Sequence, residues 1–352
     1  MTIAVAEPVC VQGRTAEVNT TMAMVLVATA LATPWAAAAQ DLSAKTVTLV
    51  VGYPPGGGYD AAARVFVRHY GRHLPGGPNV IVQNLPGAGS MVAANTLYNA
   101  APKNGSQLGM FASAVAIEPL IGNPSAKYDV TKFEWIGNLD RDAYSCGAWH
   151  TTGVETWRDA SKKKLKLAAT GVGAIQQARF LVTALGSPAD IIYGFAGIGT
   201  VHLALQRGEV DAACGIFAST ARQLFHADIE SGRLKFFVQF GREPEPYFGR
   251  AATIYSLLEN ADDRKLAALI FAPAEITRPI AAPPGTPAGT VQVLRAGFAR
   301  TVQDAEYLAD VKKMQIEPRA MSGEETAAAF AGLVDAPSAL VERAKAIVSA
   351  PP

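Results

Sequence analysis

Short apolar runs alternate with longer amphipathic stretches along most of the chain. Residues 47–51, Val-Thr-Leu-Val-Val, are almost entirely apolar, which is typical of a strand buried on both faces of a parallel sheet. Pro54 and Pro55 end this run, and the stretch at 61–67, beyond three glycines, predicts a helix. A second apolar run at 80–84 leads through another glycine-rich turn to another helical stretch. This order of elements predicts an α/β fold built on parallel strands.

The turn after the first strand consists mostly of proline and glycine. Its glycines expose backbone amides beside the start of a predicted helix, and such amides form an anion site without lysine or arginine. Neither a P-loop nor a dinucleotide-binding fingerprint fits, because Gly-Lys-Ser/Thr and the Gly-x-Gly-x-x-Gly spacing are both missing. We therefore expect the turn to bind a small anion. Its candidate ligand-binding residues are Tyr53, Pro54, Gly56, Gly57, Gly58, Tyr59 and Asp60.

The turn after the second strand repeats this plan with the sequence Pro-Gly-Ala-Gly-Ser. Ser90 is placed to cap a helix at 91–99, as Asp60 is for the first helix, so we expect Asp60 to act structurally first and to contact the ligand second. Asn84 is expected to orient the second turn through side-chain hydrogen bonds. Two such turns favour anion binding over simple chain reversal. The second turn adds Gly87, Ala88, Gly89 and Ser90 to the candidate ligand-binding residues.

Further strand and helix signals follow downstream. Strands are expected at 107–111, 135–139, 146–150, 165–169, 190–195, 210–214 and 235–240, and helices at 175–185, 200–206 and 220–229. Proline-rich breaks at 243–246 and 279–287 precede a C-terminal part with helical spacing. Within that part, Ser322 followed by Glu325 predicts a capping box at the start of a helix.

Taken in order, these motifs resemble the tripartite tricarboxylate transporter receptors, also called the Bug family of periplasmic solute-binding proteins. The resemblance rests on Pro-Pro-Gly-Gly with Asp60, on Asn-x-Pro-Gly-Ala-Gly at 84–89, and on Ala-Pro-Pro-Gly-Thr-Pro at 282–287. It covers residues 45–345 and implies a fold like that of type II periplasmic binding proteins. In that fold, two parallel-sheet α/β lobes are joined by crossover strands and hold the ligand in a cleft between them.

The resemblance also implies domain limits and a hinge that closes the cleft. Residues 40–144 and 243–352 would form the first domain, and residues 145–242 the second. Thr-Gly-Val-Gly at 170–173 and Tyr-Gly-Phe-Ala-Gly at 193–197 look like two further ligand loops of the family. The candidate ligand-binding residues that the second domain adds are Thr170, Gly171, Gly173, Phe195, Gly197 and Asp211.

Two departures from the family pattern change the part of the cleft that the second domain is expected to form. Ala174 follows Gly173 where the family usually has a hydroxyl residue, and Gly194 follows Tyr193 where a lysine is common. This half of the site is therefore expected to be more apolar than is usual. Asp211 is expected to accept a ligand hydroxyl or amine, or to brace a neighbouring loop.

Composition and charge narrow the class of protein. The chain has 352 residues, is 49 % hydrophobic, and balances 31 Lys and Arg against 30 Asp and Glu, which leaves no net field for nucleic acid or an anionic membrane. An apolar run at 22–32 followed by alanines predicts a signal peptide and N-terminal extension over residues 1–39. Cys146 and Cys214 would remain after cleavage, and an even number in an exported chain favours a disulfide over two buried thiols.

Binding is favoured over catalysis because the expected cleft loops consist mainly of glycine, alanine and proline. The sequence has no Gly-x-Ser-x-Gly elbow and no His-Glu-x-x-His motif, so we expect no catalytic residue, metal or cofactor. The prediction is a monomeric periplasmic receptor that captures a small organic acid and delivers it to the permease subunits of a membrane transporter. A periplasmic sensor that presents its ligand to a signalling partner is the alternative, and an enzyme using the same cleft is a weaker one.

Overall fold

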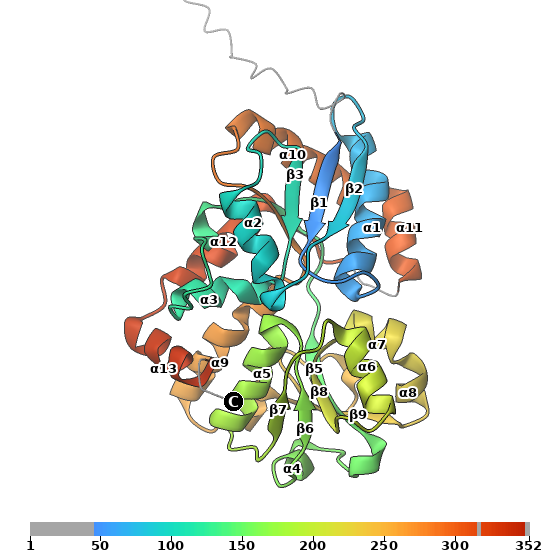
Figure 1. Cartoon of the computed structure of the whole chain (residues 1–352), viewed down its shortest axis with the longest axis vertical. Coiled ribbons are helices and arrows are strands. Elements are labelled where there is room, and N and C mark those ends of the chain that lie inside the picture. The colour runs from blue at the N-terminus through green and yellow to red at the C-terminus, as the bar shows by residue number, and fades with distance from the viewer. Residues whose placement is uncertain (1–45, 315–317, 349–352) are drawn as a thin grey trace, which may run out of the picture. The chain divides into compact units, whose positions relative to one another are not determined.

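The computed structural model of the chain describes residues 46–314 and 318–348. Two six-stranded sheets organise this part of the chain, and Figure 1 shows helices packed around each sheet. We call each sheet with its helices a lobe. The predicted signal peptide over residues 1–39 lies outside the described residues. Within 46–314 and 318–348, no helix combines the length and the apolarity needed to cross a membrane.

The sheet of the first lobe has the strand order β12-β4-β11-β3-β1-β2. Its strands are β1 (Val47–Val51), β2 (Val80–Asn84), β3 (Gln107–Met110), β4 (Glu134–Asn138), β11 (Pro279–Ala282) and β12 (Met321–Ser322). β1 pairs in parallel with β2 and β3, whereas β11 runs antiparallel to β3 and β4. The fold class expected from the sequence is confirmed, although the sheet is mixed and not wholly parallel.

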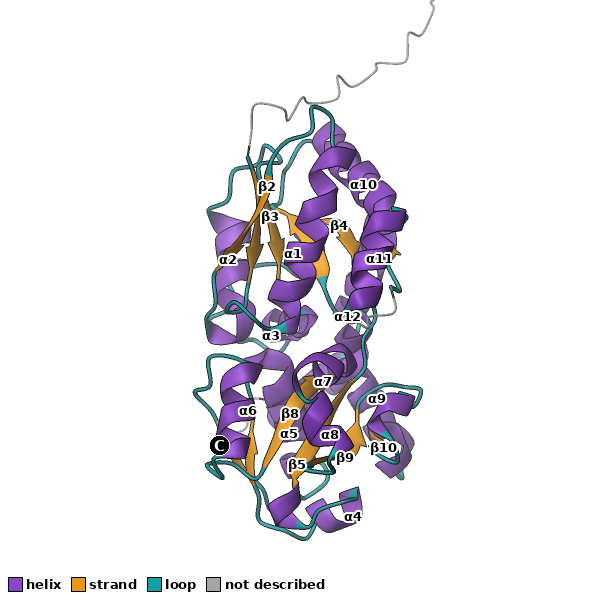
Figure 2. Cartoon of the chain, turned by 90° about the vertical axis from the view of Figure 1, so that its right-hand side faces the viewer, coloured by secondary structure: helices purple, strands orange, loops and turns teal. Residues whose placement is uncertain are grey.

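Helices cover both faces of this sheet. Figure 2 shows α2 on one face and α1, α10 and α11 on the other. The helices of the first lobe are α1 (Gly58–Tyr70), α2 (Met91–Asn99), α10 (Ala288–Val302), α11 (Ala305–Lys313) and α12 (Gly323–Val334). The capping box predicted for Ser322 and Glu325 is present at the start of α12. The short α3 (Ile117–Leu120) follows β3.

The sheet of the second lobe has the order β10-β9-β5-β8-β6-β7. Its strands are β5 (Tyr144–Trp149), β6 (Lys166–Ala168), β7 (Asp190–Ile192), β8 (Ala212–Phe217), β9 (Leu234–Gln239) and β10 (Ala252–Thr253). β6 is parallel to β7 and β8, while β5 is antiparallel to β8 and β9. The helices that accompany it are α4 (Trp157–Ala160), α5 (Gly171–Thr183), α6 (Ile198–Gln206), α7 (Ala218–Leu224), α8 (His226–Glu230), α9 (Ala261–Phe271) and α13 (Ser338–Val348).

The second lobe extends further along the chain than the resemblance implied. Its expected end at residue 242 is placed too early, because β10 pairs with β9 beyond that point. The apolar side chains of α9, such as Leu266 and Ile270, pack into the core of the second lobe, and Ala344 and Val348 of α13 join them. Residues 243–352 are therefore divided between the two lobes.

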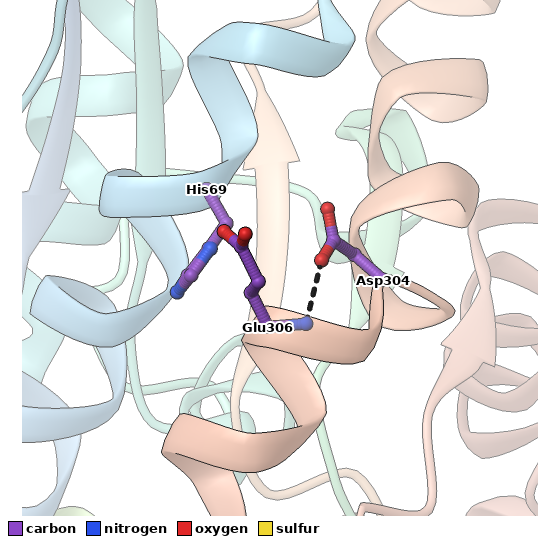
Figure 3. A group of neighbouring side chains, drawn as sticks. All are labelled: His69, Asp304 and Glu306. Carbon is purple, nitrogen blue, oxygen red and sulfur yellow. Dashed lines mark hydrogen bonds between the residues drawn. The ribbon is translucent and has the colours of Figure 1, made fainter.

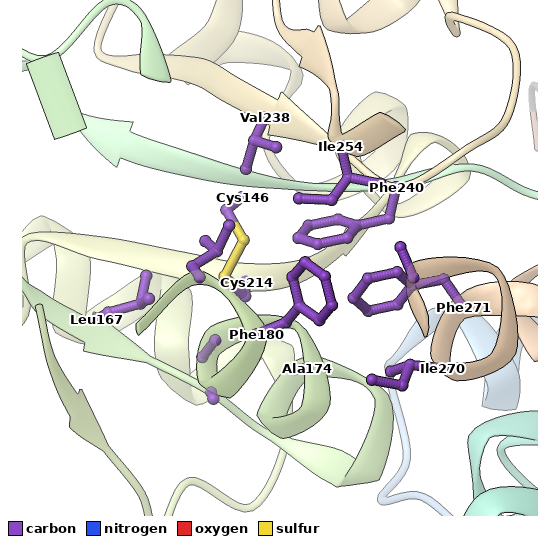
Figure 4. Close-up of a cluster of buried hydrophobic side chains, with 14 of the residues drawn as sticks. Cys146, Leu167, Ala174, Phe180, Cys214, Val238, Phe240, Ile254, Ile270 and Phe271 are labelled. Carbon is purple, nitrogen blue, oxygen red and sulfur yellow. A yellow bond between two sulfur atoms is a disulfide. The ribbon is translucent and has the colours of Figure 1, made fainter. Parts of the chain in front are cut away.

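The core of the second lobe contains the predicted disulfide. Cys146 and Cys214 are bonded, both are fully buried, and they occupy paired positions on β5 and β8. Figure 4 shows Phe180 and Phe271 in the same cluster of buried side chains. The pairing is confirmed, and the cysteines lie within β5 and β8, whereas the strands expected at 146–150 and 210–214 would place each cysteine at a strand end.

A buried ion pair joins two of the segments that connect the lobes, residues 139–143 and residues 272–278. The guanidinium of Arg278 is fully buried and pairs with the carboxylate of Asp140. It also donates a 2.8 Å hydrogen bond to the hydroxyl of Ser219 in α7. Burial raises the pKa of Asp140 to about 6, although the charge of Arg278 opposes this shift. One charged cluster thus links both crossover segments to the second lobe.

Candidate functional site

The first glycine-rich turn is held in place by Asp60, which is buried in the first turn of α1. Its carboxylate accepts hydrogen bonds from the Gly56 amide at 3.0 Å, from Arg64 Nε at 2.9 Å and from Asn84 Nδ2 at 2.9 Å. Asn84 also donates to the Tyr53 carbonyl at 3.0 Å. Burial opposes ionisation, but these hydrogen bonds prevail and hold the pKa of Asp60 below its ordinary value.

This arrangement corrects two expectations. Asp60 is not the N-cap of α1, because Gly57 occupies that position with an extended backbone. Asn84 braces the first turn and not the second. The structural role expected for Asp60 is confirmed, since its oxygens are engaged within the turn.

Gly57 leaves the N-terminus of α1 without a side-chain cap. The N–H groups of Gly58, Tyr59 and Asp60 are the first of the helix and have no acceptor within it. A Cβ built on Gly57 meets no atom within 4 Å, so the space in front of these amides is open. The turn therefore presents bare donors and the positive end of a helix dipole to a ligand.

Two helices of the second lobe begin near this turn. α5 starts at Gly171 after Thr170, and α6 starts at Ile198 after Gly197, and neither has a side-chain cap. The hydroxyl of Thr170 instead donates to the Phe195 carbonyl at 3.0 Å. The uncapped start of α6 thus faces the uncapped start of α1 across one space, whereas the start of α5 lies behind Tyr53 and against Gly89.

That space is a cavity of about 270 Å³ lined by both lobes. None of the described residues that line it carries a charge. They are Tyr53, Pro54, Pro55, Gly56, Gly57, Gly58, Tyr59, Thr170, Ala196, Gly197, Ile198, Gly199, Thr200, Leu203, Gly215, Phe217 and Thr220. We call this cavity the ligand pocket. A smaller hollow beside it shares Tyr53, Tyr59, Thr170, Gly215 and Phe217, and adds Gly173, Tyr144 and Gln177 among others.

An aromatic wall forms one side of the ligand pocket. The ring centroids of Tyr53 and Tyr59 are 4.6 Å apart, and Phe217 meets Tyr59 edge-on at 6.1 Å. The hydroxyl of Tyr59 donates to the carbonyl of Thr277 in a crossover segment. Burial raises the pKa of both tyrosines, so both remain neutral at physiological pH.

The second glycine-rich turn is not part of the ligand pocket, contrary to the expectation for Gly87, Ala88, Gly89 and Ser90. A Cβ on Gly89 would lie 2.6 Å from the Val172 amide nitrogen, so the turn packs directly against the start of α5. Ser90 does not cap α2, because its hydroxyl accepts a hydrogen bond from the Ala112 amide at 3.1 Å. The turn is a contact between the lobes. Ala88 and Gly89 line a separate surface groove.

Two more candidate residues lie away from the pocket. Asp211 directly precedes β8, at the opposite end of the strand from Phe217, and its carboxylate accepts a hydrogen bond from the Lys166 amide at 2.8 Å. It therefore braces a neighbouring strand, which agrees with the bracing role expected for it, and it does not line the ligand pocket. Phe195 packs on the core of the second lobe and offers its carbonyl to Thr170, while Ala196 and Gly197 form the pocket wall. Gly171 lies behind Tyr53, whose hydroxyl is 2.9 Å from a Cβ built on that glycine.

Sequence reasoning missed several residues of the pocket wall, chiefly Phe217, Leu203 and Thr220. Phe217 stands at the carboxyl end of β8, where ligands of open α/β sheets commonly bind. That signal was present in the sequence, but the strand was expected to end at residue 214. Leu203 lies on α6 with 47 % of its surface exposed, and this exposure of a large apolar side chain is visible only in the structure.

A larger groove of about 700 Å³ lies along the crossover at Asp140 and Asp142. Its walls carry both signs of charge, and Arg222 pairs there with Glu245 at 2.8 Å. Because acidic side chains lie among the basic ones, the groove suits a small organic anion less well than the uncharged ligand pocket does.

A third group of side chains joins the end of α1 to the start of α11. His69, Asp304 and Glu306 each place one potential metal-ligand atom within 4.8 Å of the others (Figure 3). Arg72 pairs with both carboxylates, and His73 Nε2 lies 2.6 Å from an oxygen of Asp304. Hydrogen bonds from Arg72 and His73 hold the pKa of Asp304 well below its ordinary value. We interpret this group as an ion-pair network that joins the two helices.

Comparison with known proteins agrees with this geometry. Residues 63–345 match the family described as the tripartite tricarboxylate transporter family receptor. A protein of Cupriavidus necator, the UPF0065 protein in the gbd 5′ region, is 22 % identical over 333 residues, which cover 89 % of this chain and 91 % of that protein.

Two solved structures share the fold. The periplasmic binding protein BugD has a TM-score of 0.70 and 20 % identity, and the match covers 86 % of this chain and 98 % of BugD. MatC of Rhodopseudomonas palustris, solved with bound malate, has a TM-score of 0.65 and 21 % identity, and the match covers 87 % of this chain and 99 % of MatC. On the match over residues 63–345, the chain belongs to the tripartite tricarboxylate transporter receptor family.

Proposed function

We propose that this protein is an extracytoplasmic receptor that binds a small organic carboxylate in the ligand pocket. The observation that carries this proposal is the meeting of two uncapped helix N-termini, that of α1 from the first lobe and that of α6 from the second, around a cavity whose described lining is uncharged. Each N-terminus carries a partial positive charge of roughly half a unit, and each contributes about 0.3–1 kcal/mol to holding an anion near the surface, or more when it is partly buried.

The carboxylate is proposed to bind in front of Gly57, where the open space and the bare amides of Gly58 and Tyr59 coincide. The start of α6 then faces the same ligand from the second lobe. Because the two sets of donors belong to different lobes, ligand binding favours a closed arrangement of the lobes, and the crossover segments act as the hinge.

Delivery to the permease subunits of a membrane transporter is inferred from the family, as is action in the periplasm after cleavage of residues 1–39. The ligand class is also supported by MatC, which binds malate. A sensor that presents the ligand to a signalling partner would use the same pocket. We infer binding and not catalysis because the pocket offers backbone amides and hydroxyls, with no acid–base pair among its described residues.

A thermal-shift screen of the purified protein tests this proposal. The panel pairs small carboxylic acids, aliphatic and aromatic, with the uncharged amide of each. An acid that binds only the folded protein raises its apparent stability by about 2.7 kcal/mol at a hundredfold excess over the dissociation constant. We expect at least one acid to raise the melting temperature and its amide to have no effect. Equal shifts with acid and amide, or no shift with any acid, would contradict the anion site.

A further inference from the structure

The side chains of the ligand pocket are predominantly aromatic or apolar. Tyr53, Tyr59 and Phe217 form the aromatic wall, and the rest of the apolar lining comes from Pro54, Pro55, Ala196, Ile198 and Leu203. The polar side chains are the hydroxyls of the two tyrosines and of Thr170, Thr200 and Thr220. The described lining therefore offers a ligand no amide, amine or carboxylate side chain.

Most of these hydroxyls already donate their protons within the protein. Thr170 donates to the Phe195 carbonyl at 3.0 Å, and Thr200 donates to the Gly197 carbonyl at 2.7 Å. Tyr59 donates to the Thr277 carbonyl. A hydroxyl has a single proton, so these three groups have no donor left for a ligand. A hydroxylated aliphatic acid would lose its hydration along this wall and would find only the hydroxyls of Tyr53 and Thr220 as side-chain donors in return.

A ligand ring, in contrast, would meet a wall of aromatic side chains. Tyr53 and Tyr59 form a tilted pair with 34° between their planes, and Phe217 presents its edge to Tyr59 at 65°. Aromatic rings favour such offset and edge-on neighbours over other apolar groups of equal area. Pro54 and the exposed Leu203 add further apolar surface to the same pocket.

We propose that the carboxylate bound in this pocket is carried on an aromatic ring. The carboxylate lies against the amides at the start of α1, and the ring packs against Tyr53, Tyr59 and Phe217. The inference rests on the proposed function, because it names the ligand class of the same site. It departs from hydroxylated aliphatic acids, because most of the side-chain hydroxyls in the lining already donate their protons within the protein.

Calorimetric titration of the purified protein with five probes tests the inference. Benzoate and phenylacetate carry the ring, cyclohexanecarboxylate has similar size without aromatic character, malate is a hydroxylated diacid, and benzamide lacks the charge. We expect one of the two aromatic acids to bind about tenfold more tightly than cyclohexanecarboxylate or malate, as the aromatic contacts predict. Tighter binding of malate, or equal binding of cyclohexanecarboxylate, overturns the aromatic class and leaves the receptor function standing. Benzamide binding as tightly as benzoate, or no binding by any probe, overturns the proposed function itself.

Two single variants locate the effect on the aromatic wall. Phe217→Leu keeps an apolar side chain of comparable size. Tyr53→Leu also replaces a ring, together with its hydroxyl, in the other lobe, so one variant remains informative if the other does not fold. Each is expected to weaken binding of the aromatic acid about tenfold and to leave cyclohexanecarboxylate within about twofold. Phe225→Leu is the matched control, because Phe225 is buried in the second lobe outside the pocket lining. An equal loss in Phe225→Leu, or no loss in either wall variant, would overturn the inference.

Discussion

The hydroxyl of Tyr59 donates a hydrogen bond to the carbonyl oxygen of Thr277. This contact links the first turn of α1, which forms the proposed anion site, to a segment that passes between the two lobes. The guanidinium carbon of Arg278, the next residue, lies 5.7 Å from the centroid of the Tyr59 ring. The ligand pocket and the crossover are therefore parts of one packed unit, and a change in one is expected to affect the other.

Tyr59→Phe tests this link, because it removes the hydroxyl and keeps the ring. Loss of the buried hydrogen bond is expected to lower the free energy of unfolding by about 1 kcal/mol in urea titrations and to weaken ligand binding. Tyr70→Phe is the matched control, since the Tyr70 hydroxyl donates to the Leu294 carbonyl at 2.9 Å away from the pocket. It should lose similar stability with unchanged affinity. Equal affinities in both variants would show that the crossover contact does not influence binding.

The close contact between the second glycine-rich turn and α5 gives a second prediction. Gly89 has a φ of 64° and Gly77 a φ of 56°, but only a Cβ on Gly89 would collide with backbone, 2.6 Å from the Val172 nitrogen. Gly77→Ala should cost about 1–2 kcal/mol of stability through its backbone conformation alone. Gly89→Ala should cost about 1–3 kcal/mol more because the lobes must separate. Urea unfolding measures both, and equal losses would mean that the contact is not tight.

The disulfide between Cys146 and Cys214 closes a loop with a sequence separation of 68. Replacing both cysteines by alanine should lower the free energy of unfolding by about 4 kcal/mol, because the unfolded chain regains the entropy of the open loop. Urea unfolding of the double variant and of the oxidised parent protein gives the difference directly. A loss below about 1 kcal/mol would indicate that the bond does not constrain the unfolded chain in this way.

The buried cluster at the crossover predicts a dependence of stability on pH. Asp140 and Asp142 share the single guanidinium of Arg278, and burial raises the pKa of Asp140 from 3.8 to about 6. The folded state then binds more protons than the unfolded state between these values. This protonation contributes at most about 3 kcal/mol to the free energy of unfolding. The contribution is fully present below pH 3.8 and is lost as the pH rises through about 6.

Asp142→Asn is the variant that checks this cause. It leaves one carboxylate for one guanidinium, so the fall in unfolding free energy between pH 4 and pH 7 should become shallower. Urea titrations at several pH values measure the slope. An unchanged slope in the variant would assign the pH dependence to other groups.

The sequence was informative where structure follows from neighbouring residues. The first turn, the helix that follows it and the capping box at Ser322 depend on short-range geometry, and the structure contains all three, although α1 begins at Gly58 and not after Asp60. The structural role expected for Asp60 is present, but Asp60 is not the N-cap. Gly57 takes the N-cap position, and the Asp60 carboxylate accepts its hydrogen bond from the turn from within the first turn of the helix.

The sequence does not predict in the same way which elements far apart in the chain pack against one another. The second turn, 87–90, has the same local sequence plan as the first, but only packing against Val172 reveals that it holds the lobes together. The apolar face of α9 predicts a helix that packs on a sheet, yet it does not say which sheet, so its place in the second lobe was missed. Phe217 and Leu203 join the pocket only through the approach of the two lobes.

The central claim is that bare amides at the start of α1 hold the carboxylate of the ligand, and Gly57→Val tests it most directly. The backbone at Gly57 is extended and a Cβ there meets nothing within 4 Å, so the protein should fold with a side chain placed in the anion site. Gly332→Val is the matched control, because Gly332 in α12 also has open space around its Cβ position and lies outside the pocket lining. Calorimetric titration with an acid found in the thermal-shift screen should show binding to the parent and to Gly332→Val, and none to Gly57→Val. Unchanged affinity in a folded Gly57→Val variant would contradict the proposed site.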